Sequence, residues 1–365
     1  MHNDPMVPLQ EVDHRRFDTP AILRKVAEAS RQLAELKGVA SSIPNQDVLI
    51  TTLALQEAKD SSAIENIITT HDEIFRDQAM PGEVASAAAK EVARYHQALL
   101  VGFKAVAATG LLTTNHILDI QRQLEQNRAG FRKLPGTVLK SDTGTVVYTP
   151  PQDPDQVVAL MSGLERFIND RDVFTADPLV RMALIHHQFE SIHPFYDGNG
   201  RTGRIICVLY LVKEGLLTIP ILYLSRHIVR TKTEYYRRLQ DVRDHDAWEA
   251  WVLYMLTAVE ETARQAIGTV EAIREALLVV KHRIREAHRF YSQDLINSLF
   301  SHPYTTVEFL QRDLKVVRLT ARKYLEALTA DGILVKQRVG RTNYYINTKL
   351  FDILAGEAMT EGAGV

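Results

Sequence analysis

The stretch HPFYDGNGRTGR, residues 193–204, lies between two helical patterns and decides how the rest of this sequence is interpreted. Before it stands DPLVRMALIHHQFESI, and after it the apolar run IICVLYLV continues a helix that begins within the stretch itself. Gly198 and Gly200 can adopt positive φ, so we predict a tight loop directly before this helix. Unpaired N–H groups at the start of a helix favour an anion at that place.

The charged side chains of this stretch indicate phosphate chemistry. Arg201 and Arg204 are three residues apart, so they share one helix face, and planar guanidinium groups suit phosphate oxygens. Asp197 offers the hard oxygen ligand that Mg²⁺ prefers, and His193 can accept a proton from a hydroxyl near neutral pH. Each residue alone is more often structural. Their combination within twelve residues favours phosphoryl or nucleotidyl transfer.

The same stretch resembles the signature of the Fic family, HPFx[D/E]GNGRxxR, at every fixed position. GFR at residues 130–132, followed by two β-prone runs and YTPP at 148–151, is similar to the family's β-hairpin flap. YLSRHIVRTKTEYYRRL at 223–239 resembles the segment downstream of the signature. The resemblance covers roughly residues 45–260. It implies a mainly α fold, in which a Fic helical bundle carries a small β-hairpin flap.

The resemblance implies adenylylation, the transfer of AMP from ATP to a Ser, Thr or Tyr hydroxyl of a target protein, and to the protein itself, with release of pyrophosphate. His193 would deprotonate the hydroxyl, and Asp197 would hold Mg²⁺ on the α- and β-phosphates. The flap, about residues 137–149, would dock the target as an added strand. The resemblance implies the following ATP-binding residues: Glu65, His193, Gly198, Asn199, Gly200, Arg201, Thr202, Gly203, Arg204, Thr231 and Tyr235.

Two details refine this expectation. Relatives that phosphorylate their targets replace a glycine of the loop, so intact Gly198 and Gly200 favour AMP transfer. Thr231 stands where many relatives carry an Asn near the adenine, and Tyr235 is expected beside the base.

SSAIEN, residues 61–66, resembles the family's inhibitory motif [S/T]xxxE[G/N], with Ser61, Glu65 and Asn66 at the fixed positions. This resemblance implies that Glu65 pairs with Arg204 in place of the γ-phosphate and so inhibits the enzyme. In some relatives the glutamate also orients a water that removes AMP, which leaves a bifunctional enzyme as an alternative. Residues 62–65 also form a capping box, [ST]xx[DE], which would only start a helix.

Most of the chain has helical periodicity. The low content of Gly and Pro, 18 and 13 among 365 residues, also favours helices. Gly38 is expected to end a first helix, and Asp142-Thr143-Gly144 predicts the turn of the flap hairpin. The predicted domains are an N-terminal helical region with the inhibitory motif, a catalytic core, a winged helix-turn-helix and a frayed tail. Their boundaries are 1–110, 111–275, 280–350 and 351–365.

The formal net charge of −2 conceals an uneven distribution. Residues 281–349 contain 13 Lys and Arg against 6 Asp and Glu, whereas the remainder contains 30 against 39. Within this basic segment the spacing predicts a helix-turn-helix and then a wing hairpin around Gly340. A winged helix of this kind serves either DNA or protein contacts and dimerisation. The candidate DNA-contacting residues, with Lys336 beside them, are Arg318, Arg322, Lys323, Arg338 and Arg341.

The remaining features bound the class of protein. One cysteine excludes an internal disulfide, no signal peptide is evident, and the apolar run at 205–212 is too short to cross a membrane. We therefore expect a soluble, cytoplasmic protein, and the family resemblance implies a homodimer. Cys207, His186 and His187 are expected in the core. A DNA-binding regulator whose Fic core only senses nucleotide is the second hypothesis.

Overall fold

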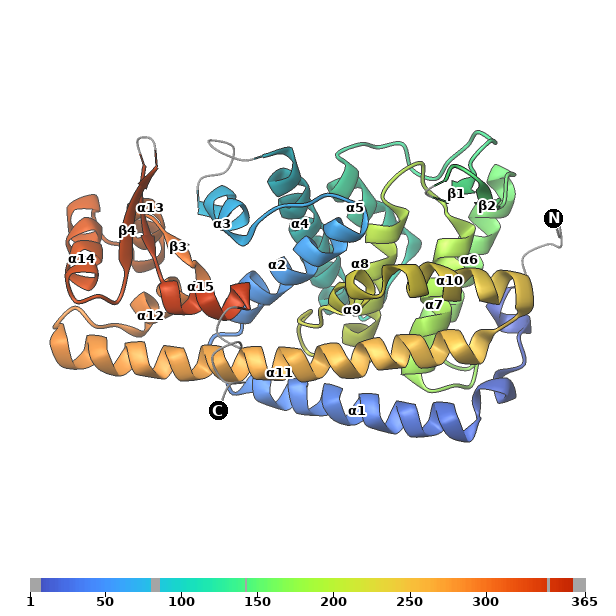
Figure 1. The fold of residues 1–365 in the computed structure, drawn as a ribbon, viewed down its shortest axis with the longest axis horizontal. Coiled ribbons are helices and arrows are strands. Elements are labelled where there is room, and N and C mark those ends of the chain that lie inside the picture. Colours follow the sequence, from blue (N-terminus) through green and yellow to red (C-terminus); the bar gives the residue numbers. More distant parts are fainter. Residues whose placement is uncertain (1–7, 80–85, 142, 340–341, 357–365) are drawn as a thin grey trace.

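A computed structural model describes residues 8–79, 86–141, 143–339 and 342–356 of the chain. The described part is mainly helical, with one two-stranded and one three-stranded antiparallel sheet (Figure 1). This confirms the predicted fold class.

Short 3₁₀ turns η1 (Leu9–Glu11) and η2 (His14–Phe17) precede the helices of the first third of the chain. These helices are α1 (Pro20–Ser41), α2 (Asp47–Ile64), α3 (His71–Ala79), α4 (Ala87–Thr109) and α5 (Thr114–Glu125). Helix α1 begins where the Thr19 hydroxyl accepts a hydrogen bond from the Ile22 N–H. It continues through Gly38, so the predicted end at that residue is wrong. The packing of α1 against a later helix outweighs the roughly 1 kcal/mol that a helical glycine costs.

The predicted hairpin is present. Strand β1 (Leu139–Lys140) pairs antiparallel with β2 (Val146–Tyr148), with Leu139 opposite Tyr148. Gly144 adopts a φ of 81° in the turn, which a side chain would disfavour. Asp142, which the sequence also placed in this turn, lies outside the described residues.

Five helices follow the hairpin: α6 (Pro154–Asn169), α7 (Pro178–Ile192), α8 (Asn199–Lys213), α9 (Leu224–Arg230) and α10 (Lys232–His245). Helices α7 and α8 are consecutive neighbours at the centre of the bundle, and nearly every residue of both is buried. A helix buried on all faces has no polar stripe turned to solvent, so the polar residues of α7 and α8, such as Glu190 and Arg204, are themselves buried. Cys207, His186 and His187 are buried here, as predicted.

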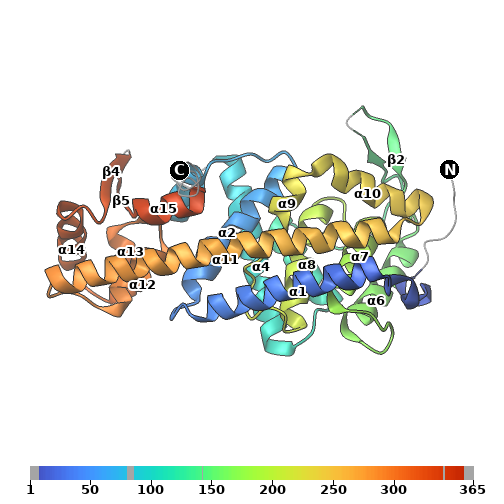
Figure 2. The same cartoon turned by 60° about the horizontal axis from the view of Figure 1, so that its bottom comes forward.

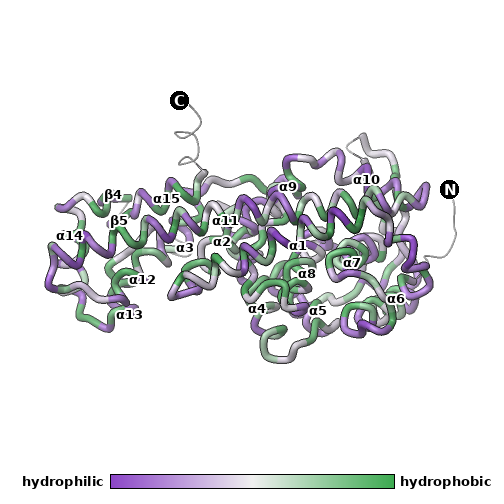
Figure 3. The backbone as a smooth tube through the Cα atoms, turned by 90° about the horizontal axis from the view of Figure 1, so that it is seen from below, coloured by the Kyte–Doolittle hydropathy of each residue, from purple (hydrophilic) through white to green (hydrophobic). Residues whose placement is uncertain are grey.

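The 40-residue helix α11 (Trp248–Ala287) runs along α1 for most of its length (Figure 2). The two helices are parallel. Lys25 on α1 pairs with Glu260 on α11, and nearer the C-terminal end of both helices Arg274 donates a hydrogen bond to Ser42. Both alternate hydrophilic and hydrophobic residues along their length (Figure 3). Helix α11 crosses the predicted boundary at residues 275–280 without a break, so it joins the core to the basic segment. None of the helices in the described ranges is long and apolar enough to span a bilayer.

The C-terminal segment contains the predicted three helices and hairpin, and two elements that sequence analysis missed. Its elements are α12 (Gln293–Ser301), β3 (Tyr304–Thr305), α13 (Val307–Leu314), α14 (Arg318–Ala330), β4 (Val335–Val339), β5 (Thr342–Ile346) and α15 (Thr348–Ala355). The sheet order is β3-β5-β4. The missed elements are β3 and α15, and α15 includes the first five residues of the expected tail. Leu350 and Leu354 are buried where α15 packs on α2 and α11. Gly340, the predicted wing turn, lies outside the described residues.

Candidate active site

A cavity of about 350 Å³ opens at the loop that connects α7 to α8. The loop contributes most of its wall, and the end of α2 contributes the rest. Its lining residues are Glu65, Ile67, His193, Tyr196, Asp197, Gly198, Asn199, Gly200 and Arg201. The inhibitory motif and the Fic signature, more than a hundred residues apart in sequence, therefore meet at one cavity.

The loop is held in shape by its own amide side chain. Asn199 accepts a hydrogen bond from the Phe195 N–H and donates one to the Phe195 carbonyl, both at 2.9 Å. Gly198 adopts a φ of 78°, and a Cβ there would lie 2.3 Å from Oε1 of Glu125. Helix α8 begins at Asn199, so the first N–H groups of the helix have no intrahelical partners. The loop and the helix start lie at the cavity, and binding of an anion there stays a prediction.

His193 ends α7 in a left-handed conformation, with a φ of 48°. The backbone is fixed there because Nε of Arg132 donates to the His193 carbonyl at 2.9 Å. Burial, together with the nearby Arg243 and Arg132, lowers the pKa of His193 to about 4, and Glu65 partly opposes this shift. The imidazole is therefore neutral at physiological pH and able to accept a proton.

Arg201 is clamped between two carboxylates. Its two terminal nitrogens donate to Glu91 on α4 and to Glu125 on α5, each at 2.8 Å. The side chain is only 6% exposed, so these acids neutralise a nearly buried cation. Sequence reasoning found neither acid, because both lie on helices that carry no part of the signature.

Arg204 is buried, and its side chain donates hydrogen bonds to the end of α2. Its Nε donates to Oγ of Ser61 at 2.8 Å, and one Nη donates to the Ser61 carbonyl at 3.1 Å and to Glu65 at 2.8 Å. Burial lowers the pKa of Arg204, but Glu65, Tyr235 and Tyr95 together raise it above its usual value. Burial likewise raises the pKa of Glu65, and Arg204 holds it below its usual value. The two charges stabilise one another.

The position of Glu65 contradicts the capping-box alternative. Helix α2 ends at Ile64, so residues 62–64 form its last turn and Glu65 is its C-cap. A capping box would need these residues to start a helix. Asn66 then turns the chain with a φ of 63°, and its side chain accepts a hydrogen bond from Lys232 at 3.1 Å.

Two further buried acids lie near Arg204. Glu57, on α2, accepts hydrogen bonds from the Tyr95 hydroxyl and the Ser225 N–H, each at 3.0 Å. Burial raises the pKa of Glu57 and of Glu190 to about 7, against the effect of Arg204. Glu57 and Glu190 are therefore further candidate functional residues. No sequence pattern identifies them, because a single buried glutamate on a helix has no signature.

Several predicted residues lie away from the cavity wall. Thr202, Gly203 and Arg204 are buried in α8 behind it. Thr231 exchanges a hydrogen bond with the Tyr254 hydroxyl at 2.8 Å. Tyr235 is 1% exposed, and its hydroxyl is 2.8 Å from Nε2 of His186. Thr231 and Tyr235 therefore have partners within the protein, and neither lines this cavity.

The candidate DNA-contacting residues lie on α14 and β4. Arg318, Arg322 and Lys323 are exposed on α14, and Arg338 is exposed on β4. Arg318 pairs with Glu308 at 3.0 Å. Arg341 lies outside the described residues.

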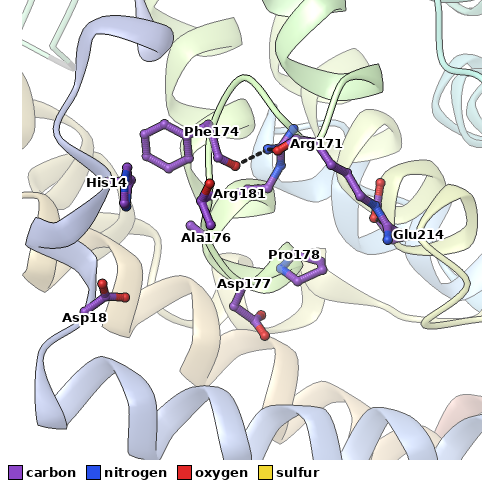
Figure 4. Close-up of a pocket in the computed structure, with 10 residues that line it drawn as sticks. His14, Asp18, Arg171, Phe174, Ala176, Asp177, Pro178, Arg181 and Glu214 are labelled. Atoms are coloured by element: carbon purple, nitrogen blue, oxygen red, sulfur yellow. Dashed lines mark hydrogen bonds and ion pairs between the residues drawn. The ribbon is translucent and has the colours of Figure 1, made fainter.

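A second cavity, of about 470 Å³, lies at the start of α7 and the end of α8, away from the loop that lines the first cavity (Figure 4). Arg181 and Glu214 line it, together with residues from η2 and the loop before α7. Arg181 is 2% exposed and donates to the carbonyls of Asp170 and Phe174, so it orders that loop. These hydrogen bonds give Arg181 a structural role.

The described residues contain no group of three or more His, Cys, Asp or Glu that could enclose a metal ion. Asp197 nevertheless fits a magnesium ion, because Mg²⁺ commonly takes one or two protein carboxylates and completes its shell with substrate phosphates and water. One oxygen of Asp197 accepts a hydrogen bond from the Gly198 N–H at 2.7 Å, and the residue is exposed at the cavity.

Comparison with known proteins identifies three matched segments. Residues 23–104 match the Fic/DOC family N-terminal model, and residues 111–211 match the Fic/DOC family model. Residues 278–350 match the C-terminal domain of SoFic-like protein adenylyltransferases. The first two segments together account for about half of the chain.

Curated relatives and solved structures agree with these matches. The chain is 30% identical to the protein adenylyltransferase fic-1 of Caenorhabditis elegans over 128 residues, which are 35% of this chain and 24% of that protein. It is also 30% identical to the protein adenylyltransferase Fic of Aedes aegypti over 151 residues, which are 41% and 28%. The matches thus span about a quarter of the length of these relatives. A crystal structure of a Fic family protein from Desulfovibrio desulfuricans G20 has the same fold, with a TM-score of 0.56 and 22% identity over 90% of this chain and 96% of that one.

Proposed function

Because this chain belongs to the Fic/DOC family, we propose that it is a protein adenylyltransferase, which moves AMP from ATP to a Ser, Thr or Tyr hydroxyl of a target protein. The observation that carries this proposal is the cavity at the start of α8, where His193 and the glycine loop face the same space. A neutral base beside an anion cradle is what nucleotidyl transfer to a hydroxyl requires.

In the proposed reaction, the neutral imidazole of His193 takes the proton of the target hydroxyl as its oxygen attacks the α-phosphorus. The oxygen–phosphorus bond forms, the bond to the β-phosphate breaks, and pyrophosphate leaves. N–H groups of the loop and the first turn of α8 stabilise the negative charge on the phosphate oxygens. Asp197 would hold Mg²⁺, which supplies charge neutralisation to the phosphates when bound.

Glu65 would inhibit this reaction by occupying Arg204. The carboxylate lines the cavity and takes the guanidinium fork that a phosphate would otherwise bind. Productive ATP binding would then need the carboxylate to leave, because Arg204 is only 1% exposed and one of its Nη atoms is already bonded to Glu65. Substitution of Glu65 by glycine is expected to raise transfer to a target or to the protein itself, and unchanged transfer would contradict this inhibition.

The reaction is tested by incubating the full chain with Mg²⁺ and ATP labelled at either the α- or the γ-phosphate. AMP transfer predicts that protein retains the α-label and not the γ-label, and that His193→Ala abolishes the incorporation. Incorporation of the γ-label would instead indicate phosphorylation. Absence of both labels from the native chain and from Glu65→Gly, with lysate proteins as targets, would favour a nucleotide-sensing regulator over an enzyme.

Duplex DNA binding is a second candidate function of the C-terminal segment. The exposed Arg318, Arg322 and Lys323 on α14 support it, together with the excess of basic residues between 281 and 349. The expected affinity falls steeply as salt is added and falls further in Arg322→Ala. Affinity that is insensitive to salt would favour a protein partner for this surface.

A further inference from the structure

Both ends of the β-hairpin are fastened to the residues that surround His193. Before β1, the Arg132 N–H donates to the Pro194 carbonyl and the Arg132 guanidinium donates to the carbonyls of Ile192 and His193. The same guanidinium bonds to the Pro151 carbonyl, beyond β2. The base of the hairpin and the end of α7 are thus parts of one hydrogen-bonded unit.

The second strand is fastened by three residues from three elements, which contact one another in a closed set. The Tyr148 hydroxyl, at the end of β2, donates to the Ser191 carbonyl at 3.0 Å. Arg243, on α10, lies with its Cζ 4.0 Å from the centre of the Tyr148 ring. Nε of Arg243 donates to Oγ of Ser191 at 3.1 Å. We call Tyr148, Ser191 and Arg243 the hairpin clamp.

The hairpin has few other means of attachment. Val146 and Val147 are 38% and 43% exposed, so the strand contributes little to the hydrophobic core. A two-stranded hairpin is marginal by itself in water and needs packing against another element. Tyr148 supplies this packing, and Arg243 forms its outer face, where α10 passes beside β2 (Figures 1 and 2).

We propose that Arg243 is a positioning residue for the transfer, which holds β2 against the end of α7 through Tyr148 and so keeps the hairpin aligned with the turn that carries His193. Its role as an aid to catalysis rests on the proposed function. The clamp itself does not, because its effects on the hairpin and on the imidazole are measurable without any substrate.

The charge of Arg243 supports this assignment. The groups that act on the His193 imidazole are the Arg243 and Arg132 cations, the Glu190 backbone carbonyl and the Glu65 carboxylate. Burial is the largest cause of the lowered pKa of His193, and Arg243 is the next. Loss of this cation removes a repulsion from protonated His193, so the pKa of His193 should rise.

The test compares the native chain with Arg243→Gln, Arg243→Lys and Tyr148→Phe, with Arg237→Gln as the matched control. Arg237 is an exposed arginine on the same helix that pairs with Asp241 at 3.3 Å. Hydrogen exchange of the hairpin amides and NMR titration of His193 are measured on the full chain. Circular dichroism and the thermal midpoint establish that each variant is folded.

Arg243→Gln is expected to speed exchange in residues 139–148 about ten-fold and to raise the pKa of His193 by about 0.5 or more. Arg243→Lys should preserve the low pKa while exchange still rises, because the ammonium cannot replace the planar group over Tyr148. Tyr148→Phe should speed exchange by a smaller factor, and Arg237→Gln should change neither quantity. If exchange in Arg243→Gln equals that of Arg237→Gln, the positioning role is wrong, whatever the His193 titration shows.

A kinetic readout follows where transfer is observed. Arg243→Gln should raise KM for the protein target several-fold more than KM for ATP, since the hairpin would orient the target and not the nucleotide. Equal changes in both would contradict the assignment. If no variant transfers AMP, the proposed function fails. The exchange and titration results still decide whether the hairpin clamp positions the hairpin.

Discussion

Arg204 and Arg181 lie on neighbouring helices and are 1% and 2% exposed, yet the protein neutralises them in different ways. Arg204 takes both its carboxylate and its hydroxyl partner from α2, a helix outside the α7–α8 pair. Arg181 takes carbonyl groups from the loop directly before its own helix, and its Nε donates to the Tyr210 hydroxyl. Burial of an arginine alone therefore does not distinguish a functional site from a structural one.

The difference lies in whether an external anion could replace the partner. Glu65 lines an open cavity, so a phosphate that enters can take its place on Arg204 without leaving a buried group unpaired. The carbonyls around Arg181 belong to the backbone of the loop before α7, and only the Phe174 carbonyl has a second donor among the described residues, the Ala176 N–H. If Arg181 moved toward a ligand, several buried carbonyls would lose their hydrogen bonds. An exchangeable partner marks the candidate active site.

The largest effect on stability is expected at Arg181. Arg181→Met leaves several carbonyls without a donor, each costing about 1–3 kcal/mol, so we expect a loss of about 4 kcal/mol or more in the free energy of unfolding. Arg204→Met should cost less, about 2–3 kcal/mol, because only Ser61 loses buried hydrogen bonds and Glu65 can be hydrated at the cavity. Urea unfolding of both variants measures the difference. Equal losses would break the distinction between the two arginines.

Activity should show the opposite order. Arg204→Met is expected to lower the rate of AMP transfer by about 100-fold or more, the usual effect of removing a donor to a developing phosphate charge. Folded Arg181→Met, assayed well below its midpoint of unfolding, should retain a rate within about three-fold of the native chain, because Arg181 is remote from the cavity. A comparable loss in both variants would show that Arg204 acts through the fold.

A change of pH is expected to have a smaller effect on the free energy of unfolding, through the buried acids that lie near Arg204. Burial raises the pKa of Glu57 and Glu190 to about 7 from an unfolded value of about 4.5. The folded protein therefore keeps protons that the unfolded chain loses, and this contribution to stability is complete below about pH 4.5 and lost as the pH rises to about 7. Unfolding at pH 5 and 7.5 should show a smaller decline in Glu190→Gln than in the native chain. An equal decline in both would contradict the raised pKa of Glu190.

The smallest effect on stability and activity is expected at an exposed ion pair, which serves as the reference for Arg181 and Arg204. Arg122 pairs with Asp119 at 2.7 Å on the surface, where its side chain is 51% exposed. Arg122→Ala should change the free energy of unfolding by less than about 0.5 kcal/mol and leave AMP transfer unchanged. A larger change would mean that exposed pairs in this protein contribute as much as buried ones.

Much of the fold and part of the site could be predicted from the sequence because their signals are local. The glycine loop, the hairpin around Gly144 and the helices beside residues 193–204 all follow from short patterns. The pairing of Glu65 with Arg204 depended on a family resemblance, since local rules equally allowed a capping box. The acids that clamp Arg201, and the carbonyls around Arg181, were not predictable, because such partners are chosen by tertiary packing. Helix α15 was missed because its apolar residues Leu350 and Leu354 are buried only by tertiary packing against α2 and α11.

The central claim is that the contact between Glu65 and Arg204 restrains AMP transfer at this cavity. The most direct measurement is the initial rate of α-label incorporation for the native chain, Glu65→Gly, Arg204→Lys and the double variant. A coupling of the usual size predicts that Glu65→Gly raises the rate about ten-fold or more while Arg204 is present, and changes it little in the Arg204→Lys background. No increase in Glu65→Gly, or an equal increase in both backgrounds, would contradict the claim.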